Sequence, residues 1–164
     1  MPAITNPRQT ILVSCRGKAS LLGNDVVKDN IITLSWHMPV SFEPMIYAIA
    51  IGKTRYSAKL IGQSKVFCIN FVPFSMEKVA ALCGRNSGEN VDKFEDYNIL
   101  KEESKSIDCP RLKEAIGYME CEVINEVEAG DHIIFFGKVL HSELKDERAS
   151  RLFQVGGTDF TTTK

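Results

Sequence analysis

The stretch NIITLSWHMPVSFEPMIYAIAI, residues 30–51, contains two strand-like segments separated by a connection with two prolines. Segments 30–36 and 45–51 are rich in Ile and aromatic residues, which favour β-strands. The second segment is apolar throughout, which predicts a strand buried on both faces. The prolines hold the connection extended, and the chain's single tryptophan, Trp36, lies just before it. We therefore predict a rigid apolar loop that could form the bottom of a pocket for a planar ring. The alternative is that Trp36 only packs against neighbouring residues of the protein.

Four further segments have strand composition, and Gly130 between the last two suits a hairpin turn with a positive φ. These segments are 9–15, 66–72, 118–128 and 132–140. Helices are expected to be short, at 54–61, 75–83, 91–97 and 109–116. Thr54 and Ser75 are the predicted caps of the first two, and Gly62 and Gly84 their predicted stops. Many strands with few helices predict a β-barrel with peripheral helices.

Length and composition limit the alternatives. A chain of 164 residues with a formal net charge of -1 predicts a single domain, 1–164, that binds neither nucleic acid nor an anionic membrane. No apolar run is long enough to span a membrane, and the start lacks signal-peptide character, so we expect a cytoplasmic protein. Five scattered cysteines without a C-x-x-C pair are expected to be reduced thiols rather than disulfides or metal ligands. The tail 156–164 is expected to be mobile unless Phe160 is held.

A phosphate site is suggested where the segment 45–51 ends. Gly52 is followed by two cations and two hydroxyl residues at the start of a predicted helix, namely Lys53, Thr54, Arg55 and Ser57. Free backbone N–H groups, hydroxyls and cations together can bind a phosphate. The GKT sequence is not a P-loop, because Tyr47 stands where that motif requires glycine. A single phosphate monoester fits this pattern, and an ordinary capped surface helix is the alternative.

The loop CGRNSGENVDKF, residues 83–94, is rich in small residues that would let a flat ligand approach the backbone. A solvated connection between two helices is the alternative, and no G-x-G-x-x-G motif supports a Rossmann site. The histidines at 37, 132 and 141 have no metal-ligand spacing, so no metal site is predicted and structural roles are expected.

Taken in order, these stretches resemble the flavin reductase-like family of FMN-binding split barrels, and most closely its flavoredoxin-like branch. The resemblance covers nearly the whole chain and rests on DNIITLSWHMPVSFEP (29–44), YSAKLI (56–61), FCINF (67–71), CGRNSGENVDKF (83–94) and ECEVINEVEAGDHIIFFGKV (120–139). It implies a mainly β fold, an antiparallel split β-barrel with a few short peripheral helices. It also implies a homodimer that holds FMN in a groove near the subunit interface.

The resemblance also implies which residues bind the cofactor. The family's flavin-facing strand matches Asn30, Thr33, Leu34, Ser35 and Trp36. Its phosphate-binding region matches Thr54, Arg55 and Ser57, beside the Lys53 already noted. Its glycine-rich loop matches Ser87, Gly88 and Lys93, its histidine matches His132, and an aromatic residue that covers the flavin matches Phe160. No catalytic side chain is implied, and Lys93 and His132 are candidates for tuning the flavin near its pyrimidine side.

The activity implied is that of an oxidoreductase. Electrons would pass from NAD(P)H or a redox protein through bound FMN to free flavin, a ferric complex or a protein acceptor. The alternatives are an FMN-binding electron carrier without a nicotinamide site, and a flavin-storage protein without redox activity. The residues alone do not choose the donor, the acceptor, or NADH over NADPH.

Overall fold

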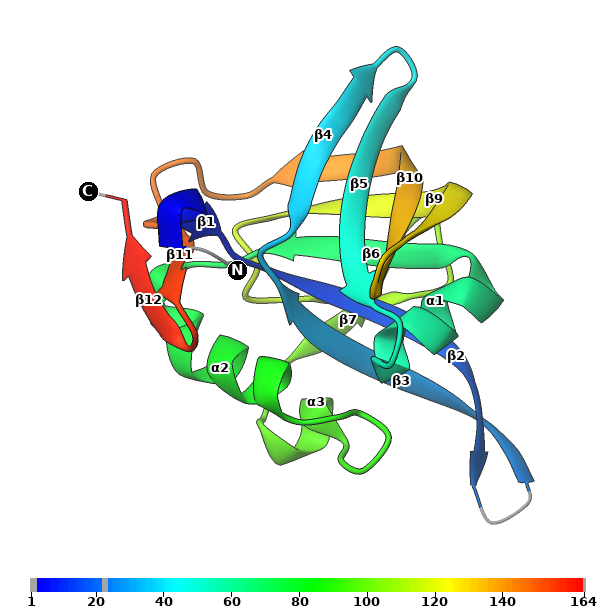
Figure 1. The fold of residues 1–164 in the computed structure, drawn as a ribbon. Helices are drawn as coiled ribbons and strands as arrows, with labels where there is room; N and C mark the ends of the chain where they lie inside the picture. The colour runs from blue at the N-terminus through cyan, green and yellow to red at the C-terminus, as the bar shows by residue number, and fades with distance from the viewer. Residues whose placement is uncertain (1–2, 22–23, 164) are drawn as a thin grey trace.

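The computed structural model of the protein describes residues 3–21 and 24–163. Its main sheet has seven antiparallel strands in the order β3-β2-β6-β9-β10-β5-β4 (Figure 1). These strands are β2 (Ile11–Leu21), β3 (Asn24–Leu34), β4 (His37–Phe42), β5 (Met45–Gly52), β6 (Val66–Phe71), β9 (Gly117–Ala129) and β10 (His132–Leu144). The smaller sheets contain β1 (Arg8–Gln9), β11 (Leu152–Gly156) and β12 (Asp159–Thr162), and β7 (Lys101–Glu103) and β8 (Pro110–Leu112). The helices are α1 (Tyr56–Ser64), α2 (Glu77–Arg85) and α3 (Lys93–Asp96), with 3-10 turns at Ala3–Thr5 and Phe74–Met76. The prediction of a mainly β, antiparallel fold with few short helices is confirmed.

The main sheet curls so that its two edges approach each other. Its edge strands β3 and β4 are consecutive in the chain and are joined only by Ser35 and Trp36. At this corner the backbone N–H of Ala50 in β5 donates to the carbonyl oxygen of Trp36 over 2.9 Å. Within the described residues the two edges do not pair strand to strand, so the sheet is a split barrel rather than a closed one.

Strand β3 separates two hydrophobic cores because its side chains alternate between its faces. Ile32 and Leu34 pack inside the curled sheet, with Ile49, Phe67 and other buried residues. Ile31 packs on the opposite side in a second core with residues of α2, α3 and β11. Helix α1 closes the first core and lies tightly on β2, since a Cβ on Gly17 would be 2.9 Å from the Leu60 side chain.

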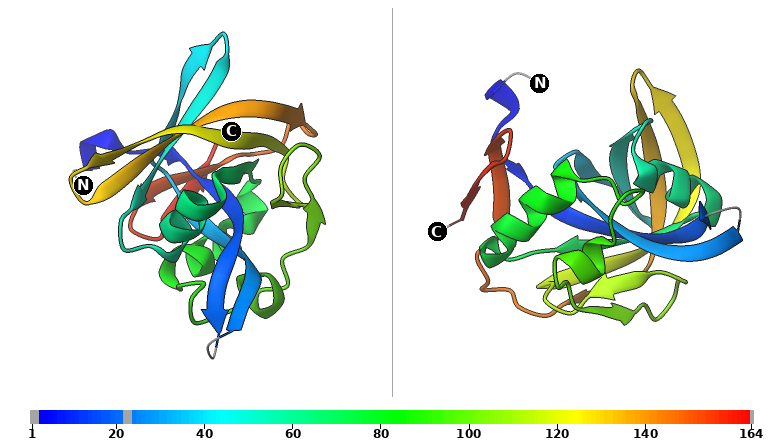
Figure 2. Two further views of the ribbon diagram at one scale, coloured as in Figure 1. Left: turned by 90° about the vertical axis from the view of Figure 1, so that its right-hand side faces the viewer. Right: turned by 90° about the horizontal axis from the view of Figure 1, so that it is seen from below.

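The second core carries the C-terminal hairpin formed by β11 and β12. Strand β11 pairs with β1, and Leu152 of β11 is fully buried in this core. Figures 1 and 2 show this hairpin beside α2, on the side of the molecule where the chain begins. Residues 159–162 form strand β12, and Phe160 packs against the second core, which is the contact on which the expected mobility of the tail depended. Lys164 lies outside the described residues.

Two predicted segments have a different structure. Residues 37–42 form strand β4 rather than a loop, because they pair with β5 from His37↔Ile49 to Phe42↔Met45. Pro39 is compatible with this pairing because β4 is an edge strand, where a missing N–H costs no ladder bond. The predicted helix 109–116 is wrong: it contains strand β8, where the Leu112 N–H donates to the buried Asn70 side chain. In 37–42 the pairing with the adjacent strand β5 prevails over the prolines, and in 110–112 hydrogen bonding to the distant Asn70 prevails over the local helix signals.

The helix boundaries also differ from those predicted. Helix α1 has Arg55 at its N-cap, without a side-chain cap, and continues through Gly62 to end at Lys65 in a left-handed conformation. Helix α2 begins after a 3-10 turn rather than at Ser75, and it continues through Gly84. Gly130 has a φ of +62°, as the predicted hairpin turn requires.

All five cysteines are buried and unpaired. Burial raises the pKa of the Cys15 thiol to about 12, so this group stays protonated at neutral pH. Among the helices that the structure describes, none combines the length and the apolar character that crossing a membrane requires.

Candidate functional site

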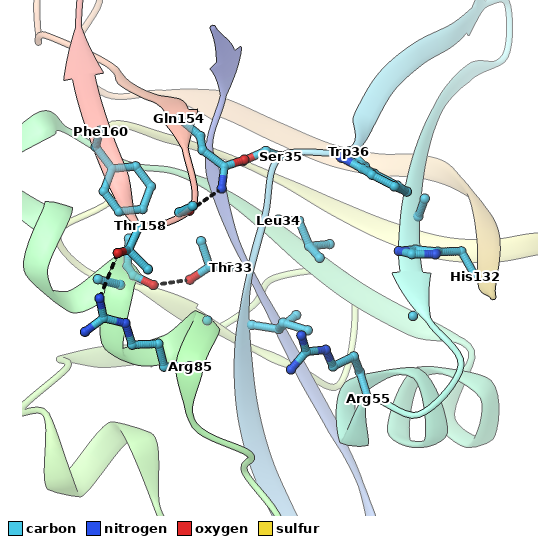
Figure 3. Close-up of a pocket in the computed structure, with 17 residues that line it drawn as sticks. Thr33, Leu34, Ser35, Trp36, Arg55, Arg85, His132, Gln154, Thr158 and Phe160 are labelled. Atoms are coloured by element: carbon cyan, nitrogen blue, oxygen red, sulfur yellow. Dashed lines mark hydrogen bonds between the residues drawn. The ribbon is translucent and has the colours of Figure 1, made fainter. Parts of the chain in front are cut away.

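A cavity of about 310 Å³ lies where the barrel is split. One wall is the end of β3 with the two residues that follow it, from Ile32 to Trp36, and another contains Ala50, Gly52 and His132. Helix α2 and the C-terminal hairpin supply the remaining wall, which includes Phe160 (Figure 3). We call this the large cavity. Its volume is at the lower end of the range typical of sites for small organic ligands.

The free edge of β3 presents backbone groups to this cavity. The hydroxyl groups of Thr33 and Ser35 are bonded within the protein, to the Ala80 carbonyl and the Thr10 hydroxyl. The Ile31 carbonyl accepts a hydrogen bond from Lys93 on the edge that faces away from β2. Because backbone direction alternates along a strand, Thr33 also points its N–H and C=O to this edge. The strand therefore offers a ligand its backbone rather than its side-chain hydroxyls.

Trp36 and His132 form an aromatic wall. Their rings stack with centroids 4.5 Å apart and planes at 25°. The Nδ1 atom of His132 is 2.7 Å from the carboxylate of Asp131, and this contact lowers the pKa of the exposed Asp131. Figure 3 shows Trp36 and His132 on one side of β3 and Phe160 on the other. A planar group between these walls would meet aromatic surface on both sides.

A second cavity, of about 100 Å³, adjoins the first and shares Ile32, Arg55 and Gly84 with it. We call it the small cavity. Its other lining residues come from β3, the start of α1, the end of α2, the loop that follows it and the start of α3, namely Asn30, Thr54, Tyr56, Ser57, Cys83, Asn86, Ser87, Gly88 and Lys93. The cavity is too small for a ring system, but it has the size and polarity for a single anionic group at the N-terminus of a helix.

Lys93 is the buried cation of the small cavity. It is 3% exposed, and its ammonium group donates to the carbonyl oxygens of Ile31 and Cys83, each over 2.7 Å. Burial lowers the pKa of Lys93 from its ordinary value of 10.5, and the nearby charge of Arg55 adds to this effect. No carboxylate accepts a hydrogen bond from this ammonium group within the described residues. An ammonium group has three N–H donors, so one is left for a bound anion.

Asn30 provides an unpaired acceptor beside Lys93. Its Nδ2 donates to the Ser57 hydroxyl over 2.8 Å, whereas its buried Oδ1 has no hydrogen-bond partner. Gly88 packs directly on this amide, since a Cβ there would be 1.9 Å from Oδ1. An unpaired buried acceptor costs about 1–3 kcal/mol, which a ligand hydroxyl could recover.

The structure thus divides the sequence-predicted residues between two adjoining cavities. The large one receives Thr33, Leu34, Ser35, Trp36, Arg55, His132 and Phe160, and the small one receives Asn30, Thr54, Arg55, Ser57, Ser87, Gly88 and Lys93. Lys53 lines neither cavity and forms an ion pair with Glu128 over 2.6 Å. Lys93 and His132, considered together from the sequence, lie in different cavities.

Arg55 connects the two cavities. Its guanidinium has no hydrogen-bond or ion-pair partner in the described part of the chain, although it lines both spaces. None of the described residues lining either cavity is an Asp or a Glu. The site is therefore locally cationic in a chain whose formal net charge is -1.

Three polar residues of the large cavity were not found from the sequence. Arg85, at the end of α2, donates to the Thr158 hydroxyl over 2.7 Å, and Gln154 donates to the Gly157 carbonyl over 2.6 Å (Figure 3). The only sequence signal was Arg85 within the loop motif CGRNSGENVDKF. Gln154 and Thr158 belong to the C-terminal hairpin, whose position depends on pairing with β1.

Comparison with known proteins gives consistent results. Residues 5–160 match the model of the flavin reductase like domain. An uncharacterized protein of Archaeoglobus fulgidus is 36% identical over 121 residues, which are 74% of this chain and 68% of that protein. A protein of Streptomyces globisporus named NADH-dependent FAD reductase is 28% identical over 119 residues, 71% of this chain and 64% of that protein. The structure of flavoredoxin from Desulfovibrio vulgaris superposes with a TM-score of 0.84 at 20% identity, covering 98% of this chain and 88% of the other.

Proposed function

The chain belongs to the flavin reductase-like family, and from this premise we propose that it is an oxidoreductase that binds FMN in the two adjoining cavities. The flavin phosphate would occupy the small cavity, and the three-ring system would occupy the large one. The observation that carries this proposal is the junction at Arg55 between a small cationic cavity and a larger one with aromatic walls.

The residues present fit FMN in three respects. Lys93, Arg55 and the first N–H groups of α1 suit a phosphate dianion. The unpaired Oδ1 of Asn30 requires a hydrogen-bond donor, and a hydroxyl of the ribityl chain would supply one. Backbone groups of Thr33 on the free edge of β3 suit the polar rim of the flavin ring.

A bound flavin supplies hydride and single-electron chemistry, and the protein binds it, orients it and controls access to it. Trp36 and Phe160 would limit water around the ring from opposite sides. His132 would hold a proton on Nδ1 toward Asp131, which leaves Nε2 to accept a hydrogen bond inside the cavity. NAD(P)H is the proposed electron donor, and free flavin, a ferric complex or a redox protein the proposed acceptor.

Anaerobic mixing of the FMN-loaded protein with NADH or NADPH tests the reaction. We expect loss of the oxidised flavin absorption within seconds to minutes, and its return when free flavin is added as acceptor. If a reduced ferredoxin-like protein bleaches the flavin but neither nicotinamide does, the chain is an electron carrier and the reductase proposal is wrong. A protein that takes up no flavin would contradict the proposal as a whole.

We further propose that the chain forms a homodimer through the β4–β5 hairpin, close to the large cavity. Figure 1 shows this hairpin projecting from the rest of the molecule. Its outer surface is apolar: Phe42 is 92% exposed, Met38 57%, and Val40 and Met45 43% each. Exposed apolar side chains gathered on one hairpin are characteristic of a protein–protein contact.

A further inference from the structure

The large cavity contains a cation that the proposed flavin does not require. Arg85 lines the large cavity and not the small one, whereas Arg55 lines both. The phosphate of FMN has Arg55 and Lys93 as partners in the small cavity. The oxidised flavin ring carries no net charge, so Arg85 has no anionic partner in the proposed flavin complex.

Arg85 is an exposed residue whose guanidinium is held at the cavity wall by a hydrogen bond. One of its terminal nitrogens donates to the Thr158 hydroxyl over 2.7 Å, which joins the end of α2 to the turn of the C-terminal hairpin. Within the described chain the guanidinium of Arg85 makes no other hydrogen bond and no ion pair, so most of its five N–H donors remain available. Figure 3 shows Arg85 and Arg55 on opposite sides of β3.

The surroundings leave access to this group. Helix α2 presents only Ala80, Ala81 and Gly84 to the cavity before Arg85. Gly84 lies against β3, since a Cβ there would be 3.4 Å from that of Thr33. No Asp or Glu is among the described residues lining the large cavity, so nothing neutralises the guanidinium from within it. Arginine binds planar carboxylates and phosphates with paired hydrogen bonds.

We propose that Arg85 is the binding residue for an anionic group, a phosphate or a carboxylate, of the second substrate that exchanges electrons with the flavin. This inference rests on the proposed function. Two sources share this chemistry: the phosphates of a nicotinamide dinucleotide as donor, and the carboxylates of a ferric chelate as acceptor. Thr158 is the positioning residue that holds the guanidinium at the wall.

The test compares charged and neutral substrates on the FMN-loaded protein. In the donor arm, flavin reduction by NADH is compared with reduction by 1-benzyl-1,4-dihydronicotinamide, which carries no phosphate. In the acceptor arm, the flavin is first photoreduced, and its oxidation by ferric citrate is compared with oxidation by neutral benzoquinone. The variants are Arg85→Gln and Arg85→Lys, with Lys78→Gln as the control that removes an exposed charge from the same helix.

We expect Arg85→Gln to raise the KM or apparent Kd for the anionic substrate of at least one arm about tenfold or more. The neutral substrate, the FMN affinity and the thermal stability should be unchanged, Arg85→Lys should recover part of the loss, and Lys78→Gln should resemble the wild type. The arm that responds identifies the source of the anion.

Three results would overturn the inference. The first is an equal effect of Arg85→Gln on charged and neutral substrates, and the second is no effect in either arm. The third is a weakened FMN affinity of this variant, which would make Arg85 part of the flavin site. Failure of the proposed function has a different signature, because the wild-type protein would then take up no flavin at all, and both proposals would fall together.

Discussion

Arg55 lines both cavities, and its surroundings show how a single side chain can define this site. It has no partner within the described chain, whereas its neighbour Lys53 is paired with Glu128. Two cations only two positions apart in the sequence thus differ in their surroundings, because only Arg55 lines the cavities.

Replacing Arg55 by Gln should weaken FMN binding about 10- to 100-fold, because a charge-assisted hydrogen bond contributes about 1.5–3 kcal/mol. Lys53→Gln is the matched control, since it removes the same charge two positions earlier without touching either cavity. Quenching of FMN fluorescence measures both affinities. Equal affinities for the two variants would contradict the placement of the phosphate in the small cavity.

The buried Lys93 predicts a pH dependence of flavin binding. Burial lowers the pKa of Lys93 from 10.5, and a bound phosphate would raise it again, so binding above the lowered pKa requires uptake of a proton. Once the phosphate is a dianion, above its second pKa of about 6, FMN affinity should fall as the pH rises through the lowered pKa of Lys93. Comparison with Lys93→Met isolates this effect, because the variant should bind more weakly and lose this part of the pH dependence. An identical alkaline profile in both proteins would refute the role of Lys93.

Gly88 and Gly62 form a contrasting pair of glycines. Gly88→Ala would place a methyl group 1.9 Å from the Asn30 Oδ1, so we expect a loss of about 1–3 kcal/mol in the free energy of unfolding and weaker FMN binding. Gly62→Ala, within α1 and with nothing within 4 Å of the added carbon, should stabilise the protein by about 0.5–1 kcal/mol. Urea unfolding measures both changes, and destabilisation of equal size in the two variants would contradict this account.

At the scale of elements, β3 organises the site. It is an edge strand, so one side of its backbone remains available to a ligand, and it separates the two cores that hold α1 and α2 in place. The start of α1 contributes Tyr56 and Ser57 to the small cavity, and the end of α2 contributes Arg85 to the large one. The site therefore lies along the unpaired edge of β3, where α1 begins and α2 ends.

At the scale of the whole molecule, strands from the first and last parts of the described chain meet beside the site. Strand β1 pairs with β11, and the hairpin that follows contributes Gln154, Thr158 and Phe160 to the large cavity. This closure of the chain on itself supports our proposal that residues 1–164 form one domain. On the other side of the corner at Trp36, the β4–β5 hairpin projects with an exposed apolar surface.

If that hairpin forms the dimer contact, Phe42→Glu should shift the protein from dimer to monomer at micromolar concentration, because it places a charge in a buried apolar interface. Leu100→Glu is the control, since Leu100 is also exposed, at 58%, but lies in a different region between α3 and β7. Sedimentation equilibrium distinguishes the two states. A Phe42→Glu dimer as stable as that of the wild type would show that the hairpin is not the contact.

The amino-acid sequence was sufficient for the family, for the mainly β fold, and for most strands, because apolar periodicity and turn residues act over a few neighbouring positions. It also predicted an anion site at the start of α1, from a glycine followed by cations and hydroxyls, and our proposal retains this site. It did not reveal that 37–42 is a strand, that 110–112 is a strand rather than helix, or that the C-terminal segment is a hairpin. Strand β4 was missed because its prolines favoured a loop although its partner β5 follows directly in the chain, whereas strand β8 and the position of the C-terminal hairpin depend on partners distant in the sequence, Asn70 and β1.

Only the tertiary structure separated Arg55 from Lys53, placed Lys93 in the small cavity apart from His132, and brought Arg85 to the wall of the large one. The physical reason is that a local pattern determines which groups a segment carries, but the direction of a side chain depends on packing against segments far away in the chain. The split of the barrel is the same kind of property. It arises because β3 and β4, consecutive in sequence, become the opposite edges of one curled sheet.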